Sequence, residues 1–214
     1  MTSPIQESIA RNTSYKCRAN TCNLPRRNLS AYCKNHYQKF YLYGDPNGKA
    51  LKQSEYKKEY DDVSELITKH LTHIATATAL KFIQDWLDNA SSGKPCVMAY
   101  EMARLCTGGV SALTILKEAT AIYLYSQRKP NSLPDDERLN YQVGIALLRL
   151  TEQYTFTDKH GNKAHRKASG TERKAIGRHL RQSLGLFLFN VVAAINKREQ
   201  EDYTFRESLW TPLG

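Results

Sequence analysis

The sequence lacks the features of a membrane or exported protein. No apolar run approaches the roughly 18 residues that a membrane-spanning helix needs. The opening residues MTSPIQESIA contain neither the basic nor the apolar stretch of a signal peptide. We therefore expect a cytoplasmic protein with no membrane partner. Its cysteines should then be reduced, which favours metal binding over disulfides.

The sequence also lacks the motifs of common enzyme classes. Gly108 and Gly109 are not followed by the Lys and the Ser or Thr of a phosphate-binding P-loop. No nucleophile elbow is present either. These absences favour a protein that is not an enzyme.

Positive charge is present in excess, and it is unevenly distributed. The net charge of the 214 residues is +10. Residues 1–60 carry a net charge of +7 and residues 158–184 carry +6, whereas residues 61–157 carry −2 and residues 185–214 carry −1. Two basic islands around a nearly neutral body are typical of a protein that contacts phosphate groups. The alternative is a solvated basic surface that serves solubility.

Cysteines are few, but three of the five lie close together and are followed by a histidine. The spacing is Cys17-x4-Cys22, ten residues, then Cys33-x2-His36. Two close ligand pairs separated by a short arm are typical of a chain that folds around one tetrahedral zinc ion. We therefore predict one structural Zn²⁺ held by Cys17, Cys22, Cys33 and His36. Four protein ligands would leave no open position for a reactive water.

The residues around the second ligand pair predict a short helix. Ser30 is expected to cap a helix that begins just before Cys33, which would place Cys33 and His36 on one helical face. Gly44 is expected to end that helix, and Pro46 cannot continue it.

The run from Cys17 to Pro46 resembles a small zinc finger of phage and bacterial mobile-element proteins, a finger often attached to HNH endonucleases. The four ligands match the pattern, and so do Tyr37 and Gly44-Asp45-Pro46. The resemblance covers about 30 residues and implies a compact DNA-holding module in a bacterial host cell. It does not imply that the chain cuts DNA.

The whole chain is predicted to be mainly α-helical. It should comprise a zinc-stabilised N-terminal module and a helical body that is interrupted by a short basic β-hairpin. The expected divisions are a flexible arm (1–14), the zinc finger (15–46), a linker (47–60), a helical domain (61–200) and a C-terminal tail (201–214). Within the body, apolar residues at helical spacing predict one long helix from Asp61 to about Asn89.

Two helices joined at Thr107-Gly108-Gly109 invite a helix-turn-helix interpretation. The would-be recognition helix after Gly109 is apolar and has almost no base-reading side chains. A buried helical hairpin is the alternative.

Residues 154–168 are predicted to form the basic hairpin, and residues 170–198 to form the last helix. Lys174, Arg178 and Arg181 recur at helical spacing, which predicts a basic face on this helix. The run Asp158 to His165 is the only local candidate for an HNH site. Its spacing is too compressed, and no Asp-His or His-His pair is present.

These observations predict a non-catalytic DNA-binding protein of a phage or mobile element, a regulator or a DNA-processing accessory, with double-stranded DNA as its partner. One alternative is a protein-interaction module that docks on a host enzyme; another is a divergent HNH-like nuclease. The residues expected to contact nucleic acid are the cations of the two islands, namely Arg26, Arg27, Lys34, Lys39, Lys163, Arg166, Lys167, Lys174, Arg178 and Arg181.

Overall fold

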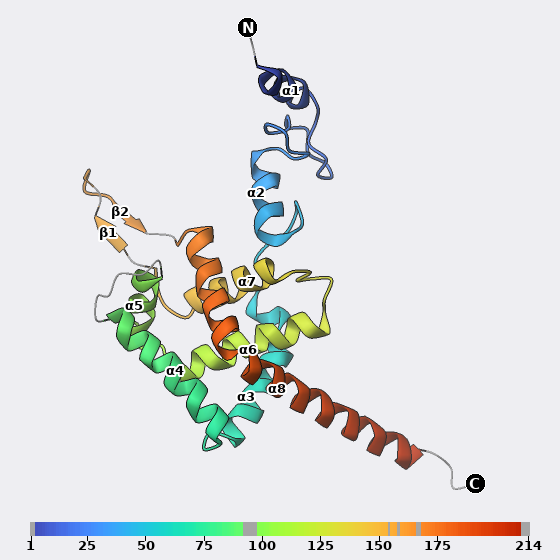
Figure 1. Ribbon diagram of the computed structural model, residues 1–214, viewed down its shortest axis with the longest axis vertical. Helices are drawn as coiled ribbons and strands as arrows, with labels where there is room; N and C mark the ends of the chain where they lie inside the picture. The colour runs from blue at the N-terminus through green and yellow to red at the C-terminus, as the bar shows by residue number, and fades with distance from the viewer. Residues whose placement is uncertain (1–2, 92–97, 154, 158, 166–167, 211–214) are drawn as a thin grey trace.

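The computed structural model describes residues 3–91, 98–153, 155–157, 159–165 and 168–210, and this part of the chain is mainly helical (Figure 1). Its helices are α1 (Pro4–Thr13), α2 (Lys34–Tyr43), α3 (Lys57–Lys69), α4 (Ile74–Ser91), α5 (Ala99–Thr107), α6 (Ala112–Arg128), α7 (Asp136–Leu148) and α8 (Gly170–Trp210), with a 3-10 turn η1 (Gln53–Glu55). None of the described helices combines the length and the apolar composition that a bilayer crossing requires.

Helix α6 lies at the centre of the body, packed against α3, α4, α7 and α8. Residues on every side of it are buried, including Ile115, Leu116, Ile122 and Leu124. A helix buried in this way cannot enter a DNA groove. The helix-turn-helix interpretation is therefore wrong, and the expected hairpin is not formed either, because α5 packs mainly on α4.

Helices α7 and α8 form the most extensive helix pair, and two glycines allow their close approach. A Cβ atom on Gly144 of α7 would lie 2.0 Å from the Arg173 carbonyl oxygen of α8. Reciprocally, a Cβ atom on Gly177 of α8 would lie 2.0 Å from the Asn140 carbonyl oxygen of α7. The two backbones are thus in contact where the helices cross.

The chain before α3 is more ordered than the sequence indicates. The predicted flexible arm contains α1, which begins with a capping box between Ser3 and Gln6. The predicted linker is packed against the body: Tyr56 is 2% exposed, and the Leu51 N–H donates to the Gln142 side chain at 3.0 Å. Composition alone does not indicate this local order, and the division of the chain into arm, finger, linker, domain and tail stays a prediction.

The predicted long helix from Asp61 to Asn89 is two helices, and this prediction was also wrong. Helix α3 ends at Lys69 and α4 begins at Ile74. The break has no Pro or Gly to signal it, and the apolar spacing continues through it. At the other end of the chain, α8 continues to Trp210 and includes part of the predicted tail.

Two three-residue strands, β1 (Thr155–Thr157) and β2 (Lys163–His165), pair antiparallel with Thr155 opposite His165. They lie in the segment for which a basic hairpin is predicted. Arg166 and Lys167 lie outside the described residues, and the side chain of Lys163 is not described. Phosphate contact by these three residues remains a prediction.

The N-terminal module lies at one end of the molecule, and α2 connects it to the body (Figure 1). Helix α2 contacts α7, where Tyr43 and Tyr141 meet edge to face with ring centres 5.4 Å apart. Gly44 ends α2 in the left-handed conformation with φ of 78°, as predicted. A Cβ atom there would collide with the Arg138 guanidinium, so this turn fits closely against α7.

Candidate metal centre

The first two cysteines lie on a tight loop that its backbone holds together. The Cys17 N–H donates to the Leu24 carbonyl at 2.9 Å, and the Arg18 N–H donates to the Ala31 carbonyl at 3.0 Å. Thr21, directly before Cys22, has a φ of 63°, which is unusual for a β-branched residue. The loop turns sharply enough to bring Cys22 back beside Cys17.

The second ligand pair lies at the start of α2. Cys33 is the N-cap residue of this helix, and His36 lies in its first turn. The predicted Ser30 cap is wrong, because the Ser30 hydroxyl instead accepts from the Tyr32 N–H at 3.1 Å. Cys33 and His36 nevertheless face the same point, as the sequence predicts.

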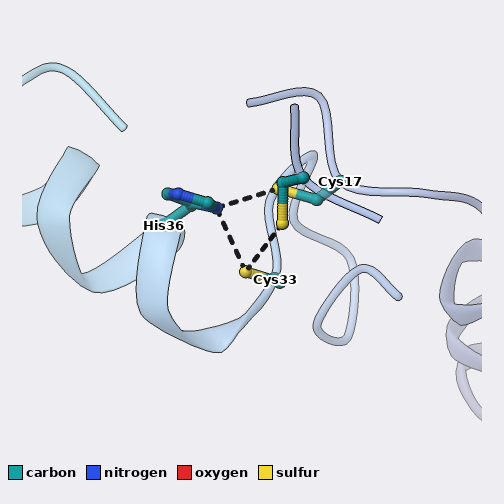
Figure 2. A group of neighbouring side chains, drawn as sticks. Cys17, Cys33 and His36 are labelled. Atoms are coloured by element: carbon teal, nitrogen blue, oxygen red, sulfur yellow. Dashed lines mark hydrogen bonds between the residues drawn. The ribbon is translucent and has the colours of Figure 1, made fainter. Parts of the chain in front are cut away.

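The four predicted ligands come together (Figure 2). Their ligand atoms all lie within 4.8 Å of one another, and Figure 2 shows Cys17, Cys33 and His36 converging. The His36 Nδ1 atom lies 3.5 Å from Cys17 Sγ and 3.3 Å from Cys33 Sγ, and Cys22 Sγ lies 3.9 Å from Cys33 Sγ. The group can hold one metal ion.

These separations match the edges of a small coordination tetrahedron. With Zn–S bonds of about 2.3 Å and Zn–N bonds of about 2.0–2.1 Å, tetrahedral geometry places ligand atoms roughly 3.5–3.8 Å apart. The Cys22–Cys33 separation of 3.9 Å is also far from the roughly 2.05 Å of a disulfide bond. The cluster therefore has the size of a metal site and is not a disulfide.

The loop also favours the thiolate form of Cys17, which is the form that binds a metal ion. Burial of Cys17 raises its thiol pKa, but hydrogen bonds from the backbone of Cys33 and Ala19 outweigh this effect and lower that pKa to about 7. At Cys22, a backbone hydrogen bond at Leu24 lowers the pKa, whereas desolvation and the thiols of Cys17 and Cys33 raise it, and the net direction is upward. Neighbouring thiolates repel, and a bound cation would remove that repulsion.

The predicted cations of the finger divide into two kinds. Arg26 is half-buried: its Nε donates to the Lys16 carbonyl at 3.0 Å, and its guanidinium lies over the Tyr15 ring. Arg26 therefore stabilises the finger itself. Arg27, Lys34 and Lys39 are exposed and remain available for phosphate contact.

The predicted basic face of α8 lies against the acidic start of α7. Lys174 is only 8% exposed, and its ammonium group lies 3.5 Å from Glu137. Arg178 also pairs with Glu137, and Arg181 pairs with Asp136 at 2.9 Å. The assignment of Lys174 to a phosphate-contacting surface is corrected by its burial. Phosphate contact by Arg178 and Arg181 stays a prediction. Both side chains already have carboxylate partners.

Sequence reasoning missed three arginines, Arg104, Arg149 and Arg173, which line one hollow together with Tyr43. They come from the end of α5, the end of α7 and the start of α8. No local spacing relates them, so only the packing of the three helices could have found this group.

The chain was compared with protein-family models, curated proteins and solved structures, and nothing in any of the three matches it. Function must therefore be argued from the metal centre and the charged surface themselves.

Proposed function

We propose that this chain is a non-catalytic, zinc-containing DNA-binding protein. The carrying observation is the Cys3His cluster, whose spacing suits a tetrahedral zinc ion, beside the exposed cations of the finger. Zinc is the metal proposed because thiolate and imidazole ligands in a closed tetrahedron are its usual structural set. The metal would hold the loop and α2 in shape and would take no part in chemistry.

Double-stranded DNA is the proposed target. Arg27, Lys34 and Lys39 provide cations on the finger surface that pair with no carboxylate among the described residues, and phosphate contact needs such cations. The Arg27 guanidinium lies over the Tyr37 ring with 5.7 Å to the ring centre, which orients it at the surface. The resemblance of Cys17–Pro46 to mobile-element fingers supports a regulator or DNA-processing accessory of a phage or mobile element.

The test compares two triple variants that lose the same charge. One carries Arg27→Ala, Lys34→Ala and Lys39→Ala; the control carries Lys57→Ala, Lys81→Ala and Lys197→Ala, whose lysines are exposed and pair four residues along their own helices. DNA affinity is measured by fluorescence anisotropy between 50 and 200 mM salt. We expect the finger variant to reduce the log–log salt slope by about 3, because each phosphate contact contributes about 0.9.

Two results would count against the proposal. One is the absence of DNA binding at low salt by the zinc-loaded protein. The other is an equal loss of affinity in both triple variants, which would indicate a non-specific effect of net charge. A parallel titration with double-stranded RNA tests the choice of DNA.

A protein-docking function is the second candidate, and a specific surface favours it. Ile74 on α4 and Leu186 on α8 are each 76% exposed, and Phe189 on α8 is 61% exposed. Beside them, α3, α4 and α8 line an apolar hollow that includes Leu66, Phe187 and Val191. A stoichiometric protein partner that survives nuclease treatment and is lost in a Leu186→Ser, Phe189→Ser variant would favour this candidate over DNA binding.

A further inference from the structure

A small hollow lies where the finger meets the body. It is lined by Tyr43 at the end of α2, Arg104, Arg149, Gln153 and Arg173, and its volume is about 200 Å³. Pockets that take drug-sized molecules have volumes of roughly 300–1,000 Å³. A space of this size suits a small group, and three guanidinium side chains around it select for an anion.

Two of these arginines have no carboxylate partner among the described residues. Arg149 donates to the Leu51 carbonyl, and Arg173 donates to the Tyr141 hydroxyl at 2.9 Å. Each guanidinium has five N–H donors, so most of the donors are not used by these contacts. Two guanidinium groups that are in no ion pair with the described part of the chain repel each other within one hollow, and an anion between them would relieve the repulsion.

Arg104 has a different role. Its Nε pairs with buried Glu101 at 2.9 Å, and its other nitrogens donate to the carbonyl groups of Leu148, Thr151 and Glu152. Its charge is compensated and its donors are largely used. Arg104 holds the turn after α7, and so it positions Arg149 at the end of that helix.

The hollow also connects to the finger. Tyr43 and Arg173 line a second, wider hollow of about 620 Å³, which includes Lys39, Lys49 and the metal ligand His36. Burial, together with the neighbouring Tyr141, raises the pKa of Tyr43 to about 12, although Arg173 and Arg149 lower it. The Tyr43 hydroxyl therefore keeps its proton at neutral pH and can donate to an anion.

We infer that Arg149 and Arg173, with the Tyr43 hydroxyl, form a binding site for one phosphate group. Paired guanidinium groups match the oxygens of phosphate in geometry as well as in charge. The phosphate group has two possible sources: the DNA that the finger holds, in which case the inference rests on the proposed function, or a free phosphate ester. The adjoining hollow with Lys39 and Lys49 favours the DNA source.

The first arm of the test uses inorganic phosphate and needs no DNA. Thermal unfolding and isothermal titration are carried out on the full-length, zinc-loaded chain, with chloride at equal ionic strength as the reference. We expect phosphate to raise the melting temperature of the wild type and to lose this effect in Arg149→Gln and in Arg173→Gln. The control, Arg198→Gln, removes one charge about 37 Å further along α8 at 1.5 Å per residue and should behave as wild type.

The second arm measures DNA affinity for the same variants. If DNA supplies the phosphate, each of the two pocket variants should lower affinity about tenfold and reduce the salt slope by about 1. If a free phosphate ester is the ligand, the pocket variants lose phosphate binding but keep wild-type DNA affinity. Either result supports the phosphate site and assigns its source.

The inference is overturned if phosphate stabilises the wild type and both pocket variants equally, or not at all, and DNA affinity is also unchanged in those variants. Melting temperatures without phosphate show whether a variant is folded. Arg149→Lys and Arg173→Lys keep the charge and should restore only part of the binding, because an ammonium group cannot make the paired contact. The proposed function fails separately, through loss of DNA binding in a protein that still binds phosphate.

Discussion

The ammonium group of Lys174 lies 4.1 Å from the centre of the Tyr41 ring, and so it joins α8 of the body to α2 of the finger. The same group lies 3.5 Å from Glu137 on α7. A lysine that the sequence places on a basic face is thus a buried contact between three helices. The finger is fixed to the body by this contact and by the packing of Tyr43 on Tyr141.

Lys174→Ala and Lys39→Ala should therefore change different properties: the first should lower stability, and the second should lower DNA affinity. Lys174→Ala is expected to lower the free energy of unfolding by about 1–2 kcal/mol, because it removes a partly desolvated cation–π contact. DNA affinity should change little. Lys39→Ala is expected to weaken DNA binding and to leave stability within about 0.5 kcal/mol. Urea unfolding and anisotropy titrations measure both quantities, and a larger affinity loss for Lys174→Ala would return that residue to the DNA surface.

Removal of the metal should unfold the finger while the helical body persists. The cluster of Cys17, Cys22 and Cys33 packs apart from the main core, so the finger has little apolar burial of its own. We expect about one zinc per chain by elemental analysis, because the described residues contain one four-ligand set. Excess chelator should expose the finger thiols to a thiol reagent and should reduce helical circular dichroism only slightly.

Cys106 provides the control for that experiment, because it lies on α5 in the body. Cys106→Ser should keep the full metal content, whereas Cys22→Ser and His36→Ala should lose it. Equal metal content in Cys22→Ser and Cys106→Ser would contradict the assigned ligand set.

The crossing of α7 and α8 predicts large effects of single methyl groups. Gly144→Ala and Gly177→Ala each place a Cβ atom 2.0 Å from a carbonyl oxygen of the facing helix, so the helices must separate. We expect each variant to lose about 1–3 kcal/mol or more of unfolding free energy, as in overpacked cores. Gly185→Ala on the same helix meets nothing within 4 Å and should instead stabilise by about 0.5–1 kcal/mol, because it removes a helical glycine. Chemical denaturation of the three variants checks this contrast, which would fail if all three changed alike.

The sequence predicted what is local in the structure. The αL turn at Gly44 and the acidic start of α7 each depend on residues within one or two turns of one another, and the ligand set lies within the short segment 17–36. Asp135 caps α7 by accepting from the Arg138 N–H at 2.8 Å. Such a contact can be predicted from the residue types alone.

The remaining features depend on residues that are far apart in the chain. Tyr56, in the predicted linker, packs into the main core, where its hydroxyl donates to Glu118 of α6. The cations of α8 are paired because α7 crosses beside them, and the arginine hollow needs three helix ends at once. The break between α3 and α4 has no turn residues, and the periodic apolar pattern continues across it. A pattern within one segment contains no information about these partners.

The buried pair of Tyr56 and Glu118 predicts a specific dependence of stability on pH. Glu118 is 3% exposed, and its Oε2 atom has no hydrogen-bond partner among the described residues. Burial raises the pKa of Glu118 above its ordinary value of 4.5, although the Tyr56 hydroxyl and Arg149 act in the opposite direction. The folded state therefore retains a proton that the unfolded chain has already released, and the free energy of unfolding falls as the pH rises above about 4.5.

Glu118→Gln should remove this contribution, because the amide keeps an oxygen that can accept from Tyr56 but does not ionise. The variant's unfolding free energy relative to wild type should thus increase from pH 4.5 to pH 8, by about 1.4 kcal/mol for each unit by which the folded pKa is raised. Glu152→Gln, at an exposed position, is the matched control. His179 also makes the free energy of unfolding depend on pH, because burial lowers its pKa. This contribution is present in every variant and therefore cancels in the difference. A difference between Glu118→Gln and wild type that stays constant over this range would show that Glu118 is ionised in the folded protein at little cost.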